Sequence, residues 1–271
     1  MANHALVQEL MAAYSSGRNI PTPPPTARDA NFNLPAAYAV EAELVRLRRA
    51  SGRSTVGVKV GFANKALWRV FKLDTLVWAH MYDDTVQFAE DNAASLTIGH
   101  MYSPKIEPEI VFRMRSPVGA DARDPGAVLS AVDWFALGFE IIDCVYPDWK
   151  FTPADFVAAF GFHRALIVGE PQLVEADTIP AVVDQLSAFT IKLLKDGQLV
   201  EEGSGKNSLR SPVLCLGELA SAISRQPAAE PLAAGDLVSS GTLTESRLIR
   251  SGEMWTTVVD GLDLPALTLR V

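Results

Sequence analysis

The chain has 271 residues, with 24 lysines and arginines against 32 aspartates and glutamates, so its formal net charge is −8. This length fits one large domain or one domain with a small addition, and the acidic balance argues against nucleic-acid binding, because phosphate recognition needs a basic face. Hydrophobic residues make up 48% of the chain and charged residues 21%, which excludes an intrinsically disordered protein.

The cysteine content and the apolar stretches bear on the cellular compartment. Cys144 and Cys215 are too few for a disulfide framework and fit a reducing compartment. The N-terminus lacks the basic region and apolar core of a secretory signal. Charged residues interrupt every apolar stretch before the roughly 20 residues that a membrane-spanning helix needs. We therefore expect a soluble, cytoplasmic protein without a membrane partner.

Two helices are predicted at the N-terminal end. Apolar residues recur at helical spacing over 5–15, and Gly17 is a plausible stop. Four prolines between residues 21 and 25 predict an extended segment, because proline lacks the amide hydrogen that a helix needs. A second helix is predicted over about 35–50, with Gly52 at its end. We therefore expect an N-terminal helical segment over 1–54.

From residue 55 onward, short runs rich in β-branched residues predict strands. The predicted strands cover 55–62, 85–88, 105–114, 135–145, 166–168, 190–195, 199–201, 236–240 and 266–271. Asp196-Gly197 between two such runs predicts a tight hairpin. Helical patterns occur near 126–133, 153–160, 178–187 and 213–225. Because strands dominate and helices do not alternate with them regularly, we predict an α+β fold with a mostly β core, in which 55–271 form the catalytic domain.

Two glutamates in the strand predicted over 105–114 are the first candidates for chemistry. Side chains two apart share one face of a strand, so Glu107 and Glu109 should project together. Two adjacent carboxylates repel each other unless water or a cation lies between them. A metal site and a solvated edge strand, which Pro108 would also suit, are both consistent with this pair.

A third glutamate lies inside an apolar run. Glu140 interrupts the stretch from Trp134 to Ile142, and a buried carboxylate needs a lysine, an arginine or a metal ion as its partner. A structural salt bridge explains Glu140 alone equally well. Together with Glu107 and Glu109, however, it gives an all-oxygen set that suits a hard cation such as Mg²⁺ or Mn²⁺.

A lysine between glycines completes the group. Lys59 shares its strand face with Gly57 and Gly61, so no neighbouring side chain covers it and another group can approach. A nearby cation favours the neutral form of a lysine, which is the form that a general base requires. A salt bridge with one of the three glutamates is the alternative.

Four segments of the chain resemble the fumarylacetoacetate hydrolase superfamily, in its branch of 2-keto-4-pentenoate hydratases and 4-oxalocrotonate decarboxylases. In chain order they are Gly57-Val58-Lys59-Val60-Gly61, Pro104-Lys105-Ile106-Glu107-Pro108-Glu109-Ile110, Phe139-Glu140-Ile141-Ile142-Asp143 followed by Asp148-Trp149, and Ala234-Gly235-Asp236 with Ser240-Gly241-Thr242-Leu243-Thr244. The resemblance runs from about residue 35 to the C-terminus. It implies a β-roll core, one divalent cation per subunit, usually Mg²⁺, with Glu107, Glu109 and Glu140 as its ligands, and a homo-oligomer.

One stretch departs from the pattern of this branch. Where the branch usually has Val-Ala-Asp-Asn-Ala-Ser, this chain has Ala159 and Phe160 in place of the Asp-Asn pair. Phe162 and His163 stand in place of small residues. We therefore expect a reshaped pocket, with Phe160, Phe162 or His163 close to the cation, and a substrate that cannot be taken over from the better-known members.

Further candidates follow from this alignment of motifs. His163 is a candidate acid or base, and Arg164 could hold a second substrate carboxylate through a paired hydrogen bond. A buried, satisfied histidine and an exposed arginine are the alternatives. Thr242 lies in the segment that resembles the loop at the mouth of the site, and Asp83 lies near where the branch places pocket residues.

We predict a metal-dependent lyase that acts on a 2-oxo acid. The carboxylate and keto oxygens of the substrate would bind the cation, and Lys59 would move a proton on the carbon skeleton or position the base. Hydration and decarboxylation pass through the same dienolate, so the sequence does not separate them. The alternatives are a C–C bond hydrolase of the same superfamily and a catalytically silent metal-binding partner subunit.

Overall fold

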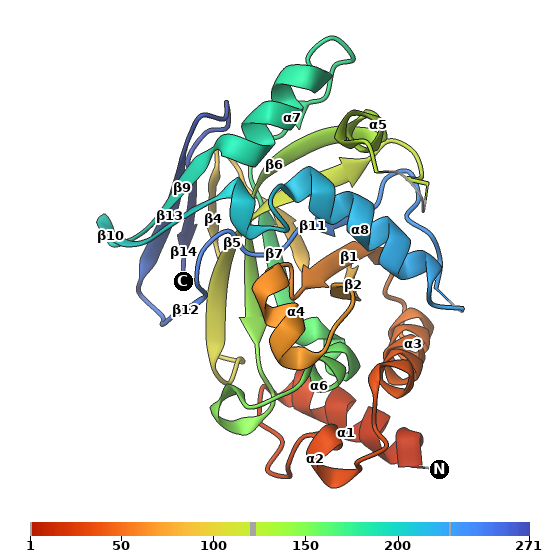
Figure 1. Ribbon diagram of the computed structural model, residues 1–271. Helices are drawn as coiled ribbons and strands as arrows, with labels where there is room; N and C mark the ends of the chain where they lie inside the picture. The colour runs from red at the N-terminus through yellow and green to blue at the C-terminus, as the bar shows by residue number, and fades with distance from the viewer. Residues whose placement is uncertain (1, 120–122, 228) are drawn as a thin grey trace.

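The computed structural model describes residues 2–119, 123–227 and 229–271, and it combines two curled sheets with helices at both ends (Figure 1). The helices are α1 (Ala2–Ser16), α2 (Pro25–Arg28), α3 (Leu34–Ala50), α4 (Lys65–Phe71), α5 (Pro125–Ser130), α6 (Pro153–Ala158), α7 (Ile179–Ala188) and α8 (Pro212–Ser224). Three 3₁₀ helices are η1 (Pro147–Trp149), η2 (Phe160–Phe162) and η3 (Gly205–Asn207).

The large sheet has the strand order β2-β1-β11-β5-β6-β7-β3, with β12 paired to β5 and β8 paired to β6. Its strands are β1 (Thr55–Gly61), β2 (Val77–Tyr82), β3 (Val86–Phe88), β5 (Pro104–Met114), β6 (Val132–Asp143), β7 (His163–Val168), β8 (Gln172–Leu173), β11 (Leu237–Ser239) and β12 (Arg247–Leu248). The order shows that β5 lies inside the sheet, between β11 and β6, which excludes the solvated edge strand considered for Glu107 and Glu109.

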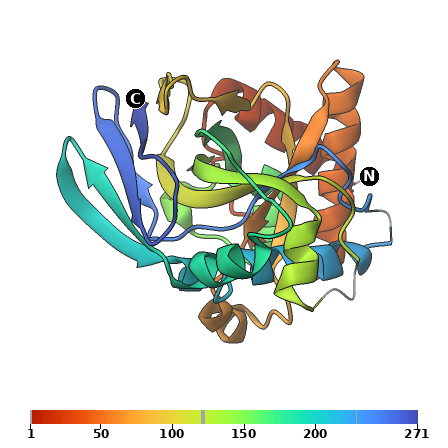
Figure 2. The same cartoon turned by 90° about the horizontal axis from the view of Figure 1, so that it is seen from above.

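The small sheet has the order β10-β9-β13-β14-β4 and stands beside the large one in the view from above (Figure 2). Its strands are β4 (Ala93–Ser95), β9 (Thr190–Lys195), β10 (Gln198–Ser204), β13 (Met254–Asp260) and β14 (Leu267–Arg270). The Asp196-Gly197 hairpin is confirmed, because Lys195 pairs with Gln198 across the turn.

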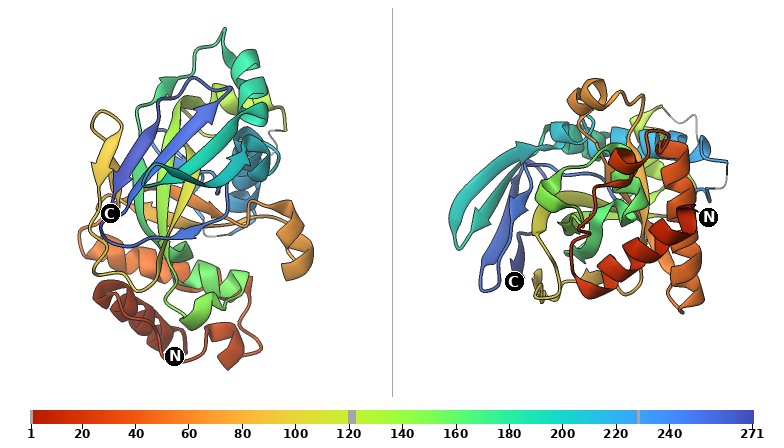
Figure 3. Two further views of the ribbon diagram at one scale, coloured as in Figure 1. Left: turned by 90° about the vertical axis from the view of Figure 1, so that its left-hand side faces the viewer. Right: turned by 90° about the horizontal axis from the view of Figure 1, so that it is seen from below.

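Apolar side chains form two main clusters. The larger cluster fills the space between the sheets and the helices α5, α7 and α8, and includes Ile106, Phe139 and Leu193. The other cluster joins α1 and α3 to α6 and η2 through residues such as Leu10 and Phe156. The N-terminal helices and α6 lie together at one end of the molecule (Figure 3). The division into a helical segment over 1–54 and a catalytic domain over 55–271 stays a prediction.

The strand pairing brings the candidate residues together. β5 and β6 are antiparallel with Glu107 opposite Glu140, and β1 joins the same sheet through β11. Val58 and Val60 of β1 point into the larger apolar cluster, so Lys59 between them points to the other face.

Most predicted elements are confirmed, with some differences. The helix predicted over 126–133 ends at Ser130, because Val132 begins β6. The helix predicted over 153–160 ends at Ala158 and gives way to η2. The helices α2 and α4 and the strands β2, β4, β8, β12 and β13 were not predicted. The proline segment that was expected to be extended leads into α2, because Pro25 takes the first helical position, where no amide hydrogen is needed. No helix in the described parts of the chain is long and apolar enough to cross a membrane.

Candidate active site

Three carboxylates converge on the face of the large sheet that β1, β5 and β6 share. Ligand oxygens of Glu107, Glu109 and Glu140 all lie within 4.8 Å of one another. Glu109 and Glu140 are completely buried, while Glu107 is partly exposed to a cavity. We predicted that Glu107 and Glu109 would meet Glu140, and the structure places the three carboxylates together.

Glu109 is held by the end of β11 and the segment that follows it. Its Oε2 accepts a hydrogen bond of 2.6 Å from the Ser239 hydroxyl and one of 2.8 Å from the Gly241 backbone N–H. Its Oε1 is buried and has no hydrogen-bond partner among the described residues. A buried carboxylate oxygen without a partner is costly, so this atom is a ready ligand for a cation between the three carboxylates.

Glu140 is held from two sides. Lys59 Nζ donates a 2.6 Å hydrogen bond to its Oε2, and His163 Nδ1 lies 2.9 Å from its Oε1. His163 Nε2 lies 2.9 Å from the Thr85 hydroxyl. The Lys59 salt bridge that the sequence left open is therefore present, inside the carboxylate cluster. His163 is 1% exposed and supports Glu140 from behind, so it does not face the cavity as an acid or base would.

The charges of the cluster shift each other's pKa values. Burial raises the pKa of Glu107 to about 7 and that of Glu109 well above its ordinary value. Burial opposes ionisation of Glu140 as well, but Lys59 and His163 hold its pKa below the usual range. Burial alone would lower the pKa of Lys59, yet the three glutamates raise it, so Lys59 is an ammonium before any cation binds.

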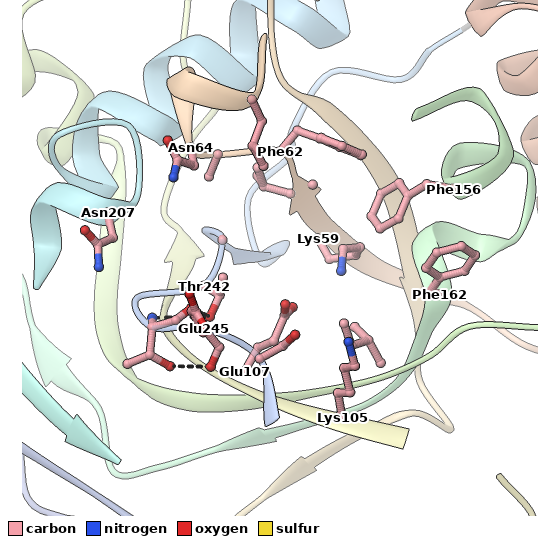
Figure 4. Close-up of a pocket in the computed structure, with 18 of the residues that line it drawn as sticks. Lys59, Phe62, Asn64, Lys105, Glu107, Phe156, Phe162, Asn207, Thr242 and Glu245 are labelled. Carbon is pink, nitrogen blue, oxygen red and sulfur yellow. Dashed lines mark hydrogen bonds between the residues drawn. The ribbon is translucent and has the colours of Figure 1, made fainter. Parts of the chain in front are cut away.

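A cavity of about 580 Å³ opens above this cluster, and Lys59 and Glu107 lie at its bottom (Figure 4). Phe162 and Thr242, both predicted from the sequence, line this cavity. The glycines beside Lys59 do not clear space for a substrate as predicted. An added Cβ at Gly61 would lie 2.4 Å from the Phe156 ring, and one at Gly57 would meet the backbone of Leu237.

Two of the site residues predicted from the sequence, Arg164 and Asp83, lie outside the cavity. Arg164 does not line the cavity, because its Nη1 donates to the Tyr14 carbonyl at 2.7 Å and its guanidinium stacks on the Tyr14 ring. Asp83 is exposed in the turn after β2 and lies outside the cavity lining. Of the three residues named for the reshaped pocket, Phe162 lines the cavity and His163 contacts Glu140, while Phe160 turns away, toward Tyr14 and Tyr82.

Sequence reasoning missed other residues of the cavity. The aromatic side chains that it missed are Phe62, Trp149, Phe151 and Phe156. Lys105 also lines the cavity, with its Nζ 3.9 Å from the centre of the Trp149 ring. The alternation that placed Glu107 and Glu109 on one face of β5 also applies to Lys105, so this residue could have been found.

Comparison with known proteins identifies relatives along most of the chain. A 2-hydroxyhexa-2,4-dienoate hydratase from Comamonas testosteroni is 27% identical over 94% of this chain and 92% of its own. A 4-oxalocrotonate decarboxylase from a Pseudomonas species is 28% identical over 91% of this chain and 90% of its own.

Solved structures show the same fold. The 4-oxalocrotonate decarboxylase from Pseudomonas putida G7, complexed with magnesium and adipate, superimposes with a TM-score of 0.87. It is 23% identical, and the match covers 99% of this chain and 97% of that one. The family model for the fumarylacetoacetate (FAA) hydrolase C-terminal domain matches residues 83–271, more than half of the chain. The family predicted from the four motifs is thereby confirmed, and this chain belongs to the fumarylacetoacetate hydrolase family.

Proposed function

We propose that this protein is a metal-dependent lyase that acts on a 2-oxo acid. The reaction is the hydration of a 2-hydroxy-dienoate or 2-keto-enoate, or a decarboxylation through the same dienolate. The observation that carries this proposal is the convergence of Glu107, Glu109 and Glu140 beside Lys59 at the bottom of a cavity. The relatives named hydratase and decarboxylase support it, since both match more than nine tenths of the chain.

The cluster fits one hard divalent cation, Mg²⁺ or Mn²⁺. Carboxylate oxygens are the ligands that these ions prefer, and Glu107, Glu109 and Glu140 would provide them. The unpartnered Oε1 of Glu109 supports this fit, as does the imbalance between three carboxylates and the single ammonium of Lys59. A bound cation of this kind supplies a Lewis acid that polarises the keto oxygen of the substrate. The solved relative complexed with magnesium also supports it.

Lys59 is the residue that we assign to proton transfer. An ammonium has three N–H groups, and in the described part of the chain one of them donates to Glu140. The other two are left for a substrate in the cavity that Lys59 lines. Glu140 fixes the position of the amine, and Phe156, whose ring centre lies 5.2 Å from Nζ, keeps water from that side. Thr242 lies on the opposite wall, where its hydroxyl donates to the Thr244 carbonyl at 3.0 Å (Figure 4).

Turnover of a substrate panel tests the proposal. The purified protein is mixed with 2-hydroxy-dienoates and unsaturated 2-oxo acids, with Mg²⁺ or with a chelator, and the ultraviolet absorbance of the dienol is followed. We expect a loss of absorbance that requires the cation. A hydrated product identifies a hydratase, and released CO₂ identifies a decarboxylase. Cleavage of a diketo acid into two acids would show that the protein is a C–C bond hydrolase and not a lyase. No turnover of any substrate would favour a catalytically silent metal-binding subunit.

Replacing Lys59 tests its role. Lys59→Ala should leave cation binding measurable by calorimetry but lower turnover by about 10²–10⁴-fold, the usual range for a lost acid–base group. Lys59→Arg keeps the charge but cannot act as a base near neutral pH. Lys72→Ala, at an exposed position on α4's C-terminal side, is the matched control. Near-full activity of Lys59→Ala would leave Lys59 as a salt-bridge partner only.

Some finer features also belong to this proposal. We infer a homo-oligomer with a β-roll core that works in the cytoplasm, in the breakdown of aromatic compounds. Three exposed apolar side chains support self-association: Leu199 and Val258 on strands of the small sheet, and Leu248 on β12. The free, buried thiols of Cys144 and Cys215 suit a reducing compartment. Light scattering during size-exclusion chromatography measures the oligomer.

A further inference from the structure

We infer that the cavity selects 2-oxo acids whose far end is an uncharged alkyl or aryl group, and discriminates against those that end in a second carboxylate. This inference rests on the proposed function and specifies its substrate class. Three observations carry it. Aromatic side chains line the cavity beyond the carboxylate cluster, Lys59 and Lys105 have partners close to that cluster, and Arg164 lies outside the cavity.

One side of the cavity is an aromatic wall, which we define as Phe62, Trp149, Phe151, Phe156 and Phe162. Neighbouring rings of the wall touch edge to face, with centroids 4.7 Å apart for Phe151 and Phe162 and 5.5 Å apart for Phe62 and Phe156. Such mutual packing fixes the rings and gives a preformed apolar surface. Leu67 of α4 extends it at the rim.

The aromatic wall begins at the reacting end of the cavity. Phe156 lies against Lys59, and Gly61 leaves the space that the Phe156 ring occupies. The close-up shows Phe156 and Phe162 on the same side of Lys59, with Glu107 below it (Figure 4). A substrate whose keto acid end lies at Glu107 and Lys59 therefore has the aromatic wall beside the rest of its chain.

The cations in the described lining are engaged near the cluster. Lys59 is paired with Glu140, and Lys105 lies over Trp149, two residues from Glu107 on the same strand face. Arg164, the residue expected to bind a second carboxylate, is turned to Tyr14 instead. The other charged side chains of the lining are acidic, Glu201, Glu202 and Glu245. Glu201 is paired with Arg247, and Glu202 is paired with Lys192.

A second carboxylate would therefore meet an unfavourable surface. Its negative charge would lie against ring faces, which carry negative electrostatic potential, or near the acidic rim. Against the aromatic wall it would lose water without gaining a hydrogen-bonding partner, because the one side-chain N–H of the wall, Trp149 Nε1, already donates to the Ser103 hydroxyl. An apolar tail, by contrast, gains about fourfold in affinity for each methylene that the wall removes from water.

A matched pair of ligands tests this preference directly. 2-Oxohexanoate and 2-oxohexanedioate have the same carbon chain and differ in that a terminal methyl is replaced by a carboxylate. Their dissociation constants are measured by calorimetry on the Mg²⁺-loaded protein, with pyruvate as the shortest 2-oxo acid. We expect 2-oxohexanoate to bind at least about tenfold more tightly than 2-oxohexanedioate, and more tightly than pyruvate.

Variants of the wall connect the preference to its cause. Phe151→Arg should weaken the binding of 2-oxohexanoate and strengthen the binding of 2-oxohexanedioate, because it places a cation in the aromatic wall. Phe62→Ser is the second variant, to be used if Phe151→Arg does not fold. It should remove the preference for 2-oxohexanoate without adding a charge. Phe88→Arg is the matched control, since Phe88 is 53% exposed on β3 and lies outside the cavity.

The outcomes separate this inference from the proposed function. If pyruvate binds but 2-oxohexanedioate binds as tightly as 2-oxohexanoate, the inference is wrong and the proposed function stands. An unchanged preference in both folded wall variants overturns it equally. If none of the three 2-oxo acids binds with Mg²⁺ present, the proposed function fails and this inference fails with it.

Discussion

Lys59 and His163 both contact the Glu140 carboxylate, and these contacts explain why Glu140 can stay ionised in the interior. The Lys59–Glu140 pair is buried, with side-chain exposures of 2% and 0%. Removing one partner of such a pair leaves an uncompensated charge that costs about 3–5 kcal/mol. A cation between the carboxylates would offset part of that cost, so the cluster and its metal ion stabilise each other.

The protonation of His163 follows from its two contacts. Burial lowers the pKa of His163, so the ring is neutral and carries one proton. With the proton on Nδ1, His163 donates to Glu140. Nε2 then accepts from the Thr85 hydroxyl when that single proton is not donated to the Tyr82 carbonyl, 2.8 Å away. This tautomer orients the Glu140 carboxylate and leaves it charged, which is how residues behind a metal ligand act.

Replacing His163 tests this positioning role. His163→Ala should lower the affinity for Mn²⁺ by about 10–100-fold, the usual effect of losing the group behind a metal ligand. His163→Gln, whose amide can donate to Glu140, should restore part of the affinity. Calorimetric titration with Mn²⁺ measures both, and His100→Ala at an exposed position is the control. Unchanged affinity with reduced turnover would instead make His163 an acid–base group.

The carboxylate cluster gives the metal-free protein a distinctive pH dependence. A carboxyl group with a raised pKa binds more protons when folded, so its contribution to stability is lost as the pH rises through that pKa. For Glu107 the folded pKa is about 7, and for Glu109 it is raised well above the ordinary value. We expect the melting temperature of chelator-treated protein to fall between about pH 5 and pH 8, and to fall less with Mg²⁺.

Thermal melting followed by circular dichroism at each pH measures this effect. Glu109→Gln should remove part of the fall, because the amide keeps the shape of the side chain without its charge. Glu175→Gln, at an exposed position, is the matched control and should leave the pH profile unchanged. Parallel pH profiles with and without Mg²⁺ would argue against a cation at this cluster.

The candidate site shows what a sequence can and cannot provide. The period of two along β5 is local, so it places Glu107 and Glu109 on one face without knowledge of the fold. The position of Glu140 beside them depends on the β5–β6 register, which sets Glu107 opposite Glu140 and cannot be read from either strand alone. Arg164 was misplaced for a related reason, since its partner Tyr14 lies in α1, far away in the sequence.

At the scale of elements, the segment η2 is the most unusual feature of the site. Phe160, Gly161 and Phe162 all have φ near +57°. Two phenylalanines in this left-handed region are costly, and such strain persists where packing holds it. The turn directs Phe160 toward Tyr14 and Phe162 into the cavity.

Gly161 is the point where this turn touches Lys59, the residue that we assign to proton transfer. An added Cβ would lie 2.8 Å from Lys59 Cδ and 2.9 Å from the Cβ of Ala79, in a conformation with φ of +57°. We expect Gly161→Ala to lower the free energy of unfolding by more than the about 1–2 kcal/mol that left-handed backbone alone costs, and to lower turnover by moving Lys59.

Urea unfolding measures the loss, and Gly197→Ala separates its two parts. Gly197 also has a positive φ, of +78°, but an added Cβ there meets nothing within 4 Å. The control should therefore lose only the backbone contribution and keep full turnover. Equal losses in both variants would mean that the space beside Lys59 adjusts without cost.

Elements with a strong local pattern were the ones that the sequence predicted. The helix α3 has a capped start, where Asn33 accepts from the Ala36 N–H, and an apolar face. The helix α4 has two turns and exposes Leu67 and Val70, so no apolar stripe marks it. The strand β13 has β-branched residues but mixed burial, and its place is set by pairing with β9 and β14.

At the scale of the whole molecule, Asp155 and Arg164 make polar contacts that fasten the N-terminal segment to the rest of the protein. Asp155, which caps α6, accepts hydrogen bonds from the backbone and hydroxyl of Thr26, at 2.9 and 2.6 Å. Arg164 binds the end of α1 through the Tyr14 carbonyl. Both attachments lie beside η2. The N-terminal helices therefore pack against the part of the chain that shapes the cavity.

Replacing Arg164 tests this attachment at the level of the whole chain. Lysine keeps the charge but lacks the planar fork that reaches Tyr14 and the His100 carbonyl, and it stacks less well on the Tyr14 ring. We expect Arg164→Lys to lower the free energy of unfolding by about 1–3 kcal/mol, because the partly buried carbonyl partners lose their hydrogen bonds.

The same variant should bind pyruvate in the presence of Mg²⁺ as the unmodified protein does, since Arg164 lies outside the cavity lining. Urea unfolding and calorimetry measure the two quantities on the same sample, and Arg69→Lys on the exposed face of α4 is the matched control. A selective loss of affinity for 2-oxohexanedioate with unchanged stability would instead place Arg164 at a substrate carboxylate. The expected pattern assigns Arg164 to holding α1 in place and leaves the discrimination between substrates to the aromatic wall.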